Sequence, residues 1–256
     1  MSNLHASVRG SGRDMLILHG MGCDLRMMEA CLEPILEDYN ELRRVYVDLP
    51  GMGRSPALEE ASADAVLDAL LDFIDHKFKG DFLLVGESYG GYLARGVAAR
   101  RADRVGGMLL LCPVVEPDKE KRSLPKERLR LADDDADGED LPGFLQYAVR
   151  INRGICRRYA REVLPGARLA DERFIARLKE RYAFSFPIRQ RLDGPVLLLC
   201  GRQDLCVGYA DALALLEDYP RASLAILDAA GHNLQLEQPD LLASLTREWL
   251  SRAGVY

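Results

Sequence analysis

Residues 82–91 read Phe-Leu-Leu-Val-Gly-Glu-Ser-Tyr-Gly-Gly, and this stretch carries the strongest signal for the fold. Its first four residues are apolar, as in a buried strand, and the residues after Gly90 have the pattern of a helix. Between them, Ser88 has a glycine two positions away on each side. Such glycines remove the side chains that would clash in a sharp strand-to-helix turn, which strains the serine backbone and exposes its hydroxyl. The stretch therefore predicts a nucleophilic serine at the end of a strand.

Short apolar runs recur along the chain, and a glycine or proline turn or an aspartate follows each of them. Near-continuous apolar runs are typical of strands buried on both faces, as in parallel sheets with crossover helices. Because helical patterns lie between several of the runs, we predict a doubly wound, mostly parallel α/β sheet. The predicted strands are Met15–Leu18, Val45–Val47, Phe82–Val85, Met108–Leu111, Val196–Leu199 and Leu224–Leu227, and the predicted helices are Asp64–Phe78, Gly91–Arg101, Tyr209–Asp218 and Pro239–Arg252.

Residues 117–188 interrupt this alternation, because they contain no convincing buried strand. Charged helical patterns take its place, over Leu124–Leu131, Phe144–Leu164 and Asp171–Phe184. We therefore predict a helical insertion at 117–188, between two strands of an α/β core formed by residues 1–116 and 189–256.

The composition is that of a globular protein, with 48% hydrophobic and 29% charged residues in a chain of 256. The net charge of −6 argues against nucleic acid or an anionic membrane as the main partner. We find no secretion signal and no apolar run that approaches the ~18 residues of a membrane span. The six cysteines lack CxxC spacing, so we expect free thiols in a cytoplasmic protein, with Cys31, Cys112 and Cys200 buried. The other three are Cys23, Cys156 and Cys206.

Polar side chains follow the ends of several predicted strands, where ligands bind in open α/β sheets. Ser88 needs a general base there, because a free hydroxyl is a weak nucleophile at neutral pH. His232 is the best of the four histidines, since it lies between the last strand and the last helix. We expect His19 to shape its own loop and His76 to be solvated, while His5 precedes the first predicted strand.

A third group must orient the imidazole of His232, and Asp204, after the strand Val196–Leu199, is the leading candidate. Asp228 and Asp211 remain as alternatives. The transition state also needs N–H donors for its oxyanion. The N–H of Tyr89, at the start of a helix, is one expected donor.

The second donor is expected from the glycine-rich loop after Met15–Leu18, where Met21 follows His19-Gly20. Gly20, Gly22 and Cys23 of this loop are candidates to line the substrate pocket. Cys23 is not expected to be a nucleophile, because no base is placed for it. Asp48 and Arg54, in the loop after the second predicted strand, are expected to brace that loop.

Three other patterns have simpler interpretations than a second site. Residues 133–138 match half of a calcium-binding EF-hand loop, but Phe144 stands where that loop needs a glutamate, so we expect a solvated acidic loop. A set of arginines near helical spacing predicts a solvated or docking stripe, with the alternative that one of them binds a substrate carboxylate. These are Arg150, Arg153, Arg157, Arg158 and Arg161. The aromatic residues Phe144, Tyr147, Phe184 and Phe186 are expected in the core of the insertion, some facing the pocket.

Taken together, these residues resemble the α/β-hydrolase-fold superfamily. The matching elements are His19-Gly20-Met21-Gly22, Asp48–Ser55, Gly86–Gly90, Gly201–Asp204, and Gly231-His232 before Gln238-Pro239, in the family order Ser, Asp, His. The resemblance implies a cap domain at 117–188 and an oxyanion hole formed by the N–H groups of Met21 and Tyr89. One departure is that only Asn3–Arg9 precedes the first predicted strand, so an early edge strand is expected to be missing or shortened.

The expected function is a serine hydrolase that acts by acyl transfer on small or medium carboxylic esters, with no metal or organic cofactor. The same three residues would also serve a thioesterase, an aminopeptidase, or a carbon–carbon bond hydrolase acting on ring-cleavage products. An alternative of another class is a receptor that binds a small ligand without turning it over. The expected partner is a small-molecule substrate, and the protein is expected to be a monomer or a homodimer.

Overall fold

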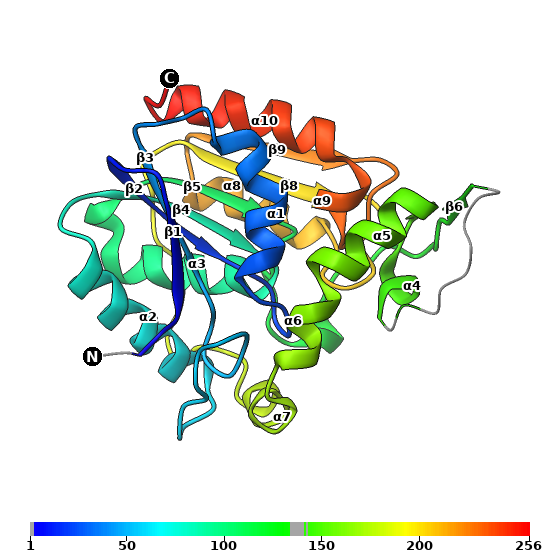
Figure 1. Cartoon of the computed structure of the whole chain (residues 1–256), viewed down its shortest axis with the longest axis horizontal. Coiled ribbons are helices and arrows are strands. Elements are labelled where there is room, and N and C mark those ends of the chain that lie inside the picture. The colour runs from blue at the N-terminus through cyan, green and yellow to red at the C-terminus, as the bar shows by residue number, and fades with distance from the viewer. Residues whose placement is uncertain (1–2, 134–140, 142) are drawn as a thin grey trace.

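The computed structural model describes residues 3–133, 141 and 143–256 of the chain. In that part of the chain seven strands form one sheet, in the order β1-β3-β2-β4-β5-β8-β9 (Figure 1). Neighbouring strands run parallel except for β1, which is antiparallel to β3. The mostly parallel sheet predicted from the apolar runs is therefore confirmed. Its strands are β1 (Ala6–Arg9), β2 (Arg13–Leu18), β3 (Leu42–Val47), β4 (Phe82–Glu87), β5 (Val105–Leu111), β8 (Val196–Gly201) and β9 (Ala222–Leu227).

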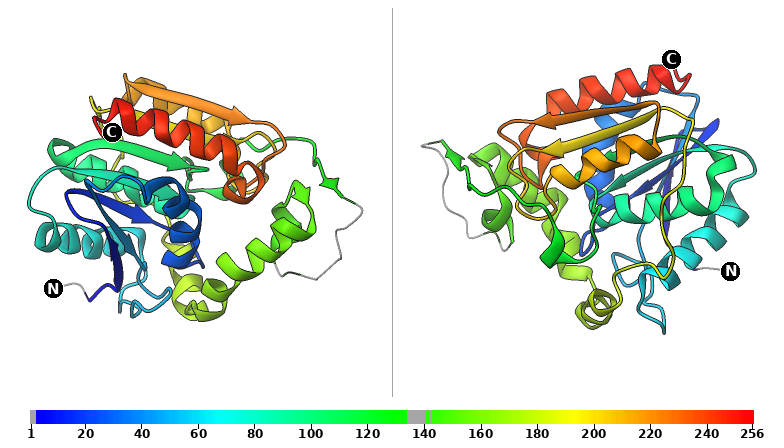
Figure 2. Two further views of the ribbon diagram at one scale, coloured as in Figure 1. Left: turned by 45° about the horizontal axis from the view of Figure 1, so that its top comes forward. Right: turned by 180° about the vertical axis from the view of Figure 1, so that it is seen from behind.

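Helices cover both faces of the sheet, as a doubly wound fold requires (Figures 1 and 2). On one face α1 (Leu25–Leu36) contacts α10 (Pro239–Arg252), and on the other α2 (Ala63–Lys77) contacts α3 (Tyr89–Arg101), with α8 (Leu215–Asp218) on the same side. The prediction for α10 has the observed bounds, and α3 begins two residues earlier than predicted. The predicted helix at 209–218 divides into a 3₁₀ turn, Ala210–Ala214, and α8.

The sequence patterns do not predict α1, because Pro34 lies inside it and obscures the helical signal. The helix nevertheless begins at a regular N-cap, where the Asp24 carboxylate accepts a hydrogen bond from the backbone N–H of Arg26 at 3.1 Å. Its apolar face, which includes Leu25 and Met28, is buried against the sheet. Burial of that face, rather than helix propensity, stabilises α1.

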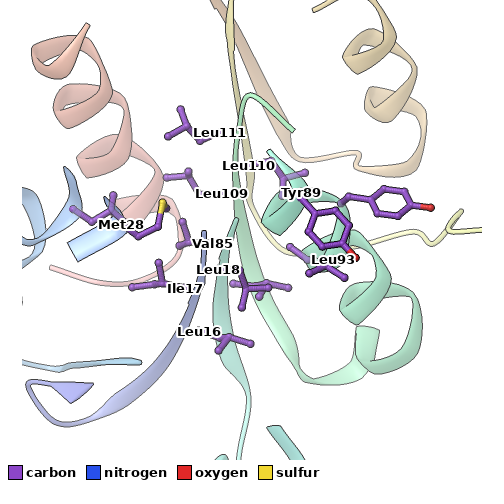
Figure 3. Packing of buried hydrophobic residues seen from close by; sticks show 14 of the residues in the cluster. Leu16, Ile17, Leu18, Met28, Val85, Tyr89, Leu93, Leu109, Leu110 and Leu111 are labelled. Carbon is purple, nitrogen blue, oxygen red and sulfur yellow. The ribbon is translucent and has the colours of Figure 1, made fainter. Parts of the chain in front are cut away.

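The central strands bury side chains on both faces, as parallel strands between two helical layers must. Figure 3 shows Val85 and Leu109 on the side of the sheet that Met28 of α1 covers. Leu110, the next residue of β5, points to the opposite side, toward Leu93 of α3. All five side chains are 1% exposed or less. Each contributes roughly 1.5–3 kcal/mol through burial, so this core holds the strand ends, and with them the site, in place.

The strand at the amino-terminal edge of the sheet is short. β1 has four residues and pairs antiparallel with β3, from Ala6 opposite Val47 to Arg9 opposite Arg44. The sheet therefore ends in a four-residue strand at this edge, and the expectation that an early edge strand of the family is missing or shortened stays a prediction.

The segment 117–188 carries most of the helical differences from the prediction. Residues 124–131, predicted as a helix, contain no helix and are largely exposed. The predicted helix at 144–164 is divided into α4 (Phe144–Tyr147), the two-residue strand β7 (Arg150–Ile151) and α5 (Arg153–Glu162), before α6 (Leu164–Leu169). The break has a physical cause, because the Glu237 carboxylate accepts hydrogen bonds from the backbone N–H of Val149 at 2.6 Å and of Arg150 at 3.2 Å.

Two further elements complete this segment. The predicted helix at 171–184 is observed as α7 (Glu172–Glu180), and β7 pairs with another two-residue strand, β6 (Leu131–Ala132). Both views in Figure 2 place α5 and α6 beyond the carboxyl ends of the sheet strands. A short 3₁₀ turn, Lys119–Lys121, lies in the chain that leaves β5, and α9 (Leu234–Glu237) precedes α10.

Among the residues that the structure describes, none of the helices has both the length and the apolar character needed to cross a membrane.

Candidate active site

Ser88 lies at the turn between β4 and α3, in the strained conformation that its flanking glycines predict. Its backbone has φ 53° and ψ −114°, a region that residues with a side chain rarely adopt. A Cβ atom on Gly86 would collide with the carbonyl oxygen of Gly90, and one on Gly90 would lie 2.5 Å from the carbonyl oxygen of Leu18. The glycines are therefore needed for close packing of the turn against β2, and the turn projects the Ser88 hydroxyl from the sheet edge.

Three loops, which follow β4, β8 and β9, bring Ser88, Asp204 and His232 together. Nε2 of His232 is 2.9 Å from Oγ of Ser88, and its Nδ1 is 2.9 Å from Oδ2 of Asp204. The second carboxylate oxygen of Asp204 accepts hydrogen bonds from the backbone N–H of Cys206 and Val207, at 2.8 and 3.0 Å. These donors hold the carboxylate, which is fully buried, in a single orientation.

The alternative acids lie elsewhere. Asp228 is exposed and accepts a hydrogen bond from the side chain of Gln203 at 2.7 Å. Asp211 accepts from the backbone N–H of Ser123 at 3.0 Å. Of the three aspartates considered, Asp204 is thus the one in contact with His232.

The protonation of His232 follows from this geometry. Burial by itself lowers the pKa of the imidazole, but the Asp204 carboxylate and the Cys206 side chain together outweigh burial and raise the pKa well above its usual value. In the neutral form of the ring, the Nδ1–H is donated to Asp204 and Nε2 carries the lone pair that can accept the proton of the Ser88 hydroxyl, and the raised pKa strengthens this base. The pair can therefore act as an oriented general base beside a serine.

The loop after β2 passes close to Ser88. His19 is buried and braces this loop, as expected, since its Nδ1 is 2.7 Å from the carbonyl oxygen of Gly20 and its Nε2 accepts from the N–H of Leu49 at 3.0 Å. Gly22 has φ +74°, in the left-handed region that favours glycine. The backbone N–H groups of Met21 and Tyr89 are without an acceptor in the part of the chain that the structure describes.

The neighbouring loop is braced by Asp48. Its carboxylate accepts hydrogen bonds from the backbone N–H of Leu25 at 2.8 Å and of Arg54 at 2.9 Å, and lies 2.9 Å from Nδ1 of His5. The expectation that Asp48 braces this loop is confirmed, and Arg54 takes part through its backbone. The remaining histidine, His76, is half exposed on α2.

Two buried glutamates at the site were not anticipated. Glu87 is 4% exposed, and its Oε1 lies 3.7 Å from Nε2 of His232. Burial raises the pKa of Glu87 to about 7, although His232 and a hydrogen bond from the Gly20 N–H oppose the rise. Glu237 accepts the backbone N–H of Gly231 at 2.6 Å and so anchors the loop that carries His232. Glu87 lies between the glycine and the serine of the turn, at a position where the Gly-x-Ser-x-Gly pattern specifies no residue type, so no sequence pattern pointed to it.

A pocket of about 320 Å³ opens onto the Ser88 hydroxyl. Of the three predicted lining residues, Cys23 lines it, whereas Gly20 and Gly22 do not. Met21, which was expected as an oxyanion donor, also lines it. Burial raises the pKa of the Cys23 thiol, which keeps it protonated, so it is poorly suited to act as a nucleophile. The remaining lining residues are Val114, Lys119, Arg122, Gly143, Tyr147, Tyr159, Val163, Lys179, Tyr182, Cys206, Val207, His232 and Asn233.

No arginine of the stripe at 150–161 lines this pocket, so the alternative that one of them binds a substrate carboxylate there is wrong. Arg158 and Arg161 instead form ion pairs with the buried Glu162 at 3.1 and 2.6 Å. Of the four aromatic residues, Tyr147 faces the pocket and Phe144 is buried in the core. The other two, Phe184 and Phe186, are half-buried, and Phe184 stacks on Tyr92 of α3.

One group of potential metal ligands occurs at the site. Within the described residues, Cys112, Asp204 and His232 bring ligand atoms within 4.8 Å of one another. Burial raises the pKa of the Cys112 thiol, whereas a metal ligand must be a thiolate. Asp204 and His232 also already bind each other, so this group is better suited to proton transfer than to metal binding. The EF-hand-like residues 134–138 lie outside the described residues.

Comparisons with known proteins agree with the fold described above. The sequence profile of the alpha/beta hydrolase family matches residues 15–245. A pimeloyl-[acyl-carrier protein] methyl ester esterase of Shewanella woodyi is 30% identical over 132 residues, which cover 50% of this chain and about half (48%) of that protein. An esterase of the same name from Nitrosomonas europaea is 26% identical, covering 95% of this chain and 98% of that protein. The crystal structure of an alpha/beta superfamily hydrolase from Oenococcus oeni superimposes with a TM-score of 0.92 at 29% identity, covering 98% of this chain and 97% of the other.

Proposed function

The chain belongs to the alpha/beta hydrolase family, and we propose that it is an ester hydrolase with Ser88 as its nucleophile. The observation that carries this proposal is the chain of two 2.9 Å contacts, from Ser88 Oγ to His232 Nε2 and from His232 Nδ1 to Asp204. A serine, a base and an orienting acid in this order activate the hydroxyl for attack on a carbonyl carbon. The names of the relatives, which are methyl ester esterases, support an ester as the substrate.

In the proposed reaction, the Ser88 oxygen attacks the ester carbonyl while His232 takes its proton through Nε2. Asp204 keeps the imidazole in the productive tautomer and stabilises the imidazolium that forms. The negative charge of the tetrahedral intermediate develops on the former carbonyl oxygen, where the N–H groups of Met21 and Tyr89 would bind it. Each such donor contributes roughly a hundred- to a thousandfold in rate.

Collapse of the intermediate expels the alcohol, which receives the proton held by His232, and leaves an acyl group on Ser88. Water then enters, gives a proton to His232 and attacks the acyl carbon, and the second collapse releases the acid and restores the hydroxyl. We assign residues 117–188 to a cap over the site, because Lys119, Arg122, Tyr147 and other residues of that segment line the pocket. A pocket of about 320 Å³ suits a small or medium ester.

The proposed partner is therefore a small molecule. All six cysteines are free, which supports the proposal of a reducing, cytoplasmic location.

A fluorophosphonate probe tests the nucleophile, because it reacts only with an activated serine. We expect the probe to label the wild-type protein at Ser88, and the Ser88→Ala variant to lose both labelling and the hydrolysis of short-chain aryl esters. Ser244→Ala, on the exposed face of α10, is the matched control and should keep both. Equal ester turnover in wild type and Ser88→Ala would refute the proposed mechanism, and a folded protein without labelling would instead favour a ligand receptor.

A further inference from the structure

Three cationic side chains line the pocket beside Ser88. Lys119, Arg122 and Lys179 line it together with Ser88 and His232, and no aspartate or glutamate of the described chain is among its lining residues. The chain as a whole has a net charge of −6. Three cations in one substrate pocket of an acidic protein therefore indicate that the pocket favours a negatively charged ligand.

Arg122 is the most firmly held of the three. Its Nε donates to the carbonyl oxygen of Glu116 at 2.9 Å, and its Nη1 donates to the carbonyl oxygen of Cys206 at 3.0 Å. These acceptors are neutral, so they fix the orientation of the guanidinium without cancelling its charge. A half-buried guanidinium retains hydrogen-bond donors for a planar anion such as a carboxylate.

The charge of Arg122 also reaches the wall of the pocket. Burial raises the pKa of the phenol of Tyr182, and the nearby positive charge of Arg122 opposes that rise. The same opposition acts on the pKa of Tyr147, which burial likewise raises. Both tyrosines line the pocket, so an anion bound between them would experience the same attraction.

The two lysines approach the pocket from separate segments. Lys119 belongs to the 3₁₀ turn after β5, and Lys179 to the last turn of α7. Both are exposed, and neither forms an ion pair within 4.0 Å in the part of the chain that the structure describes. The acid nearest in sequence to Lys119, Asp118, pairs with Lys121 at 3.0 Å. The lysine charges are thus available to a ligand at the mouth of the pocket.

We propose that this pocket is selective for esters that carry a second, anionic group, with Arg122 as the main anion-binding residue and the two lysines as an attracting rim. A half-ester of a dicarboxylic acid has the required form: the ester carbonyl meets Ser88, the apolar chain lies along the tyrosines, and the free carboxylate meets Arg122. This inference rests on the proposed esterase function, and it adds the chemical class of the substrate.

The test compares monomethyl esters of short straight-chain dicarboxylic acids with methyl esters of monocarboxylic acids of equal length. We expect kcat/KM to be about tenfold higher for the best anionic ester, as one hydrogen-bonded ion pair in a half-buried pocket would provide. Raising the salt concentration from about 0.1 M to about 1 M shortens the Debye length from about 10 to about 3 Å and should reduce this preference. A wild-type protein that hydrolyses both esters equally, or prefers the neutral one, would overturn the inference.

Substitutions of the three cationic residues show which of them causes the preference for the anionic ester. Arg122→Gln should bring the ratio of the two kcat/KM values close to one, and Arg122→Lys, which keeps the charge, should retain part of the preference. The double variant Lys119→Gln/Lys179→Gln should reduce the ratio about threefold, since exposed charges act weakly. Lys79→Gln is the matched control, because Lys79 is exposed before β4, at the opposite end of that strand from Ser88. An unchanged ratio in the Arg122→Gln variant would exclude Arg122 as the anion site.

A binding measurement separates this inference from the proposed function. Calorimetry on the Ser88→Ala variant compares the Kd of the half-ester with that of the neutral ester, without any turnover. We expect the half-ester to bind about tenfold more tightly. If wild type hydrolyses no ester but the half-ester still binds more tightly, the proposed function fails and the anion site stands. If neutral esters are hydrolysed and the half-ester has no advantage in binding, the anion site alone fails.

Discussion

Glu87 makes the folded protein sensitive to pH, and its replacement by glutamine tests how the site is assembled. The carboxyl is 4% exposed, and burial raises its pKa from the ordinary 4.5 to about 7. At about 1.4 kcal/mol for each pH unit, this difference corresponds to about 3 kcal/mol of folding free energy. Glutamine has nearly the same shape and can still accept the hydrogen bond from Gly20, but it does not ionise.

The sign follows from proton binding. Below pH 4.5 the carboxyl is protonated in the folded and the unfolded states, so its raised pKa does not change the free energy of unfolding. Between about pH 4.5 and 7 the unfolded chain loses the proton while the folded protein keeps it, so the free energy of unfolding falls as the pH rises. Above pH 7 the carboxyl is ionised in both states, and the free energy of unfolding is lowered by the full amount of about 3 kcal/mol. Glu87→Gln should therefore be more stable than wild type by about 3 kcal/mol at pH 8 and about equally stable near pH 4.

The assay is urea or thermal unfolding of both proteins at a series of pH values. For a domain of this size about 3 kcal/mol corresponds to a rise in Tm of roughly 6–12 °C at pH 8. Glu248→Gln, which removes an exposed carboxylate on α10, is the control and should shift stability little at any pH. A Glu87→Gln variant that is less stable than wild type at pH 8, or whose advantage does not change with pH, would refute the reasoning.

The same substitution has a kinetic consequence. The Glu87 carboxylate lies 3.7 Å from Nε2 of His232 and stabilises the imidazolium by about 1 kcal/mol even at the dielectric constant of water. Its removal should lower the pKa of His232, so the acidic limb of the profile of kcat/KM against pH moves down by about one pH unit. An acidic limb that stays in place would mean that Glu87 is uncharged when His232 titrates.

Two further substitutions test the proposed catalytic geometry. Asp204→Asn should lower kcat about 10⁴-fold, because an amide no longer holds the required tautomer of His232. Asp228→Asn, which changes the exposed alternative acid, should leave kcat within about twofold. Similar losses in both variants would contradict the assignment of Asp204. Gly86→Ala should lower the free energy of unfolding, measured by urea denaturation, by about 1–3 kcal/mol, because its new methyl group collides with the backbone of Gly90. The displaced turn should also lower kcat/KM by about a hundredfold or more. A fully active and stable variant would show that the turn can relax.

The architecture was accessible from sequence because its signals are local. A buried parallel strand is a short apolar run, and β2, β4, β5 and β8 each contain one that was assigned correctly. The carboxyl ends of parallel strands meet at one edge, so residues after those runs are expected together even when far apart in the chain. That reasoning anticipated the contacts of His232 with Ser88 and Asp204, which lie 144 and 28 residues away.

The predicted secondary structure was wrong where contacts with residues distant in the sequence outweigh the local pattern. The segment 144–164 has a helical pattern, but the Glu237 carboxylate binds the N–H groups of Val149 and Arg150 and keeps that part extended. α1 forms despite Pro34, because its apolar face is buried against the sheet. The sequence of 144–164 gives no sign of Glu237, and the sequence of α1 gives no sign of the sheet that buries it.

The chain order of strands, turns and polar residues thus sufficed for the fold class, the strained serine turn and the three residues proposed for acyl transfer. The tertiary structure was needed for the rest: Glu87 beside His232, the two pocket candidates that do not reach the pocket, and Arg122 lining it instead of the arginine stripe. The physical reason is that burial and periodicity are properties of a segment, whereas the charge around a site depends on side chains from separate elements. Their distances are decided only when the elements pack.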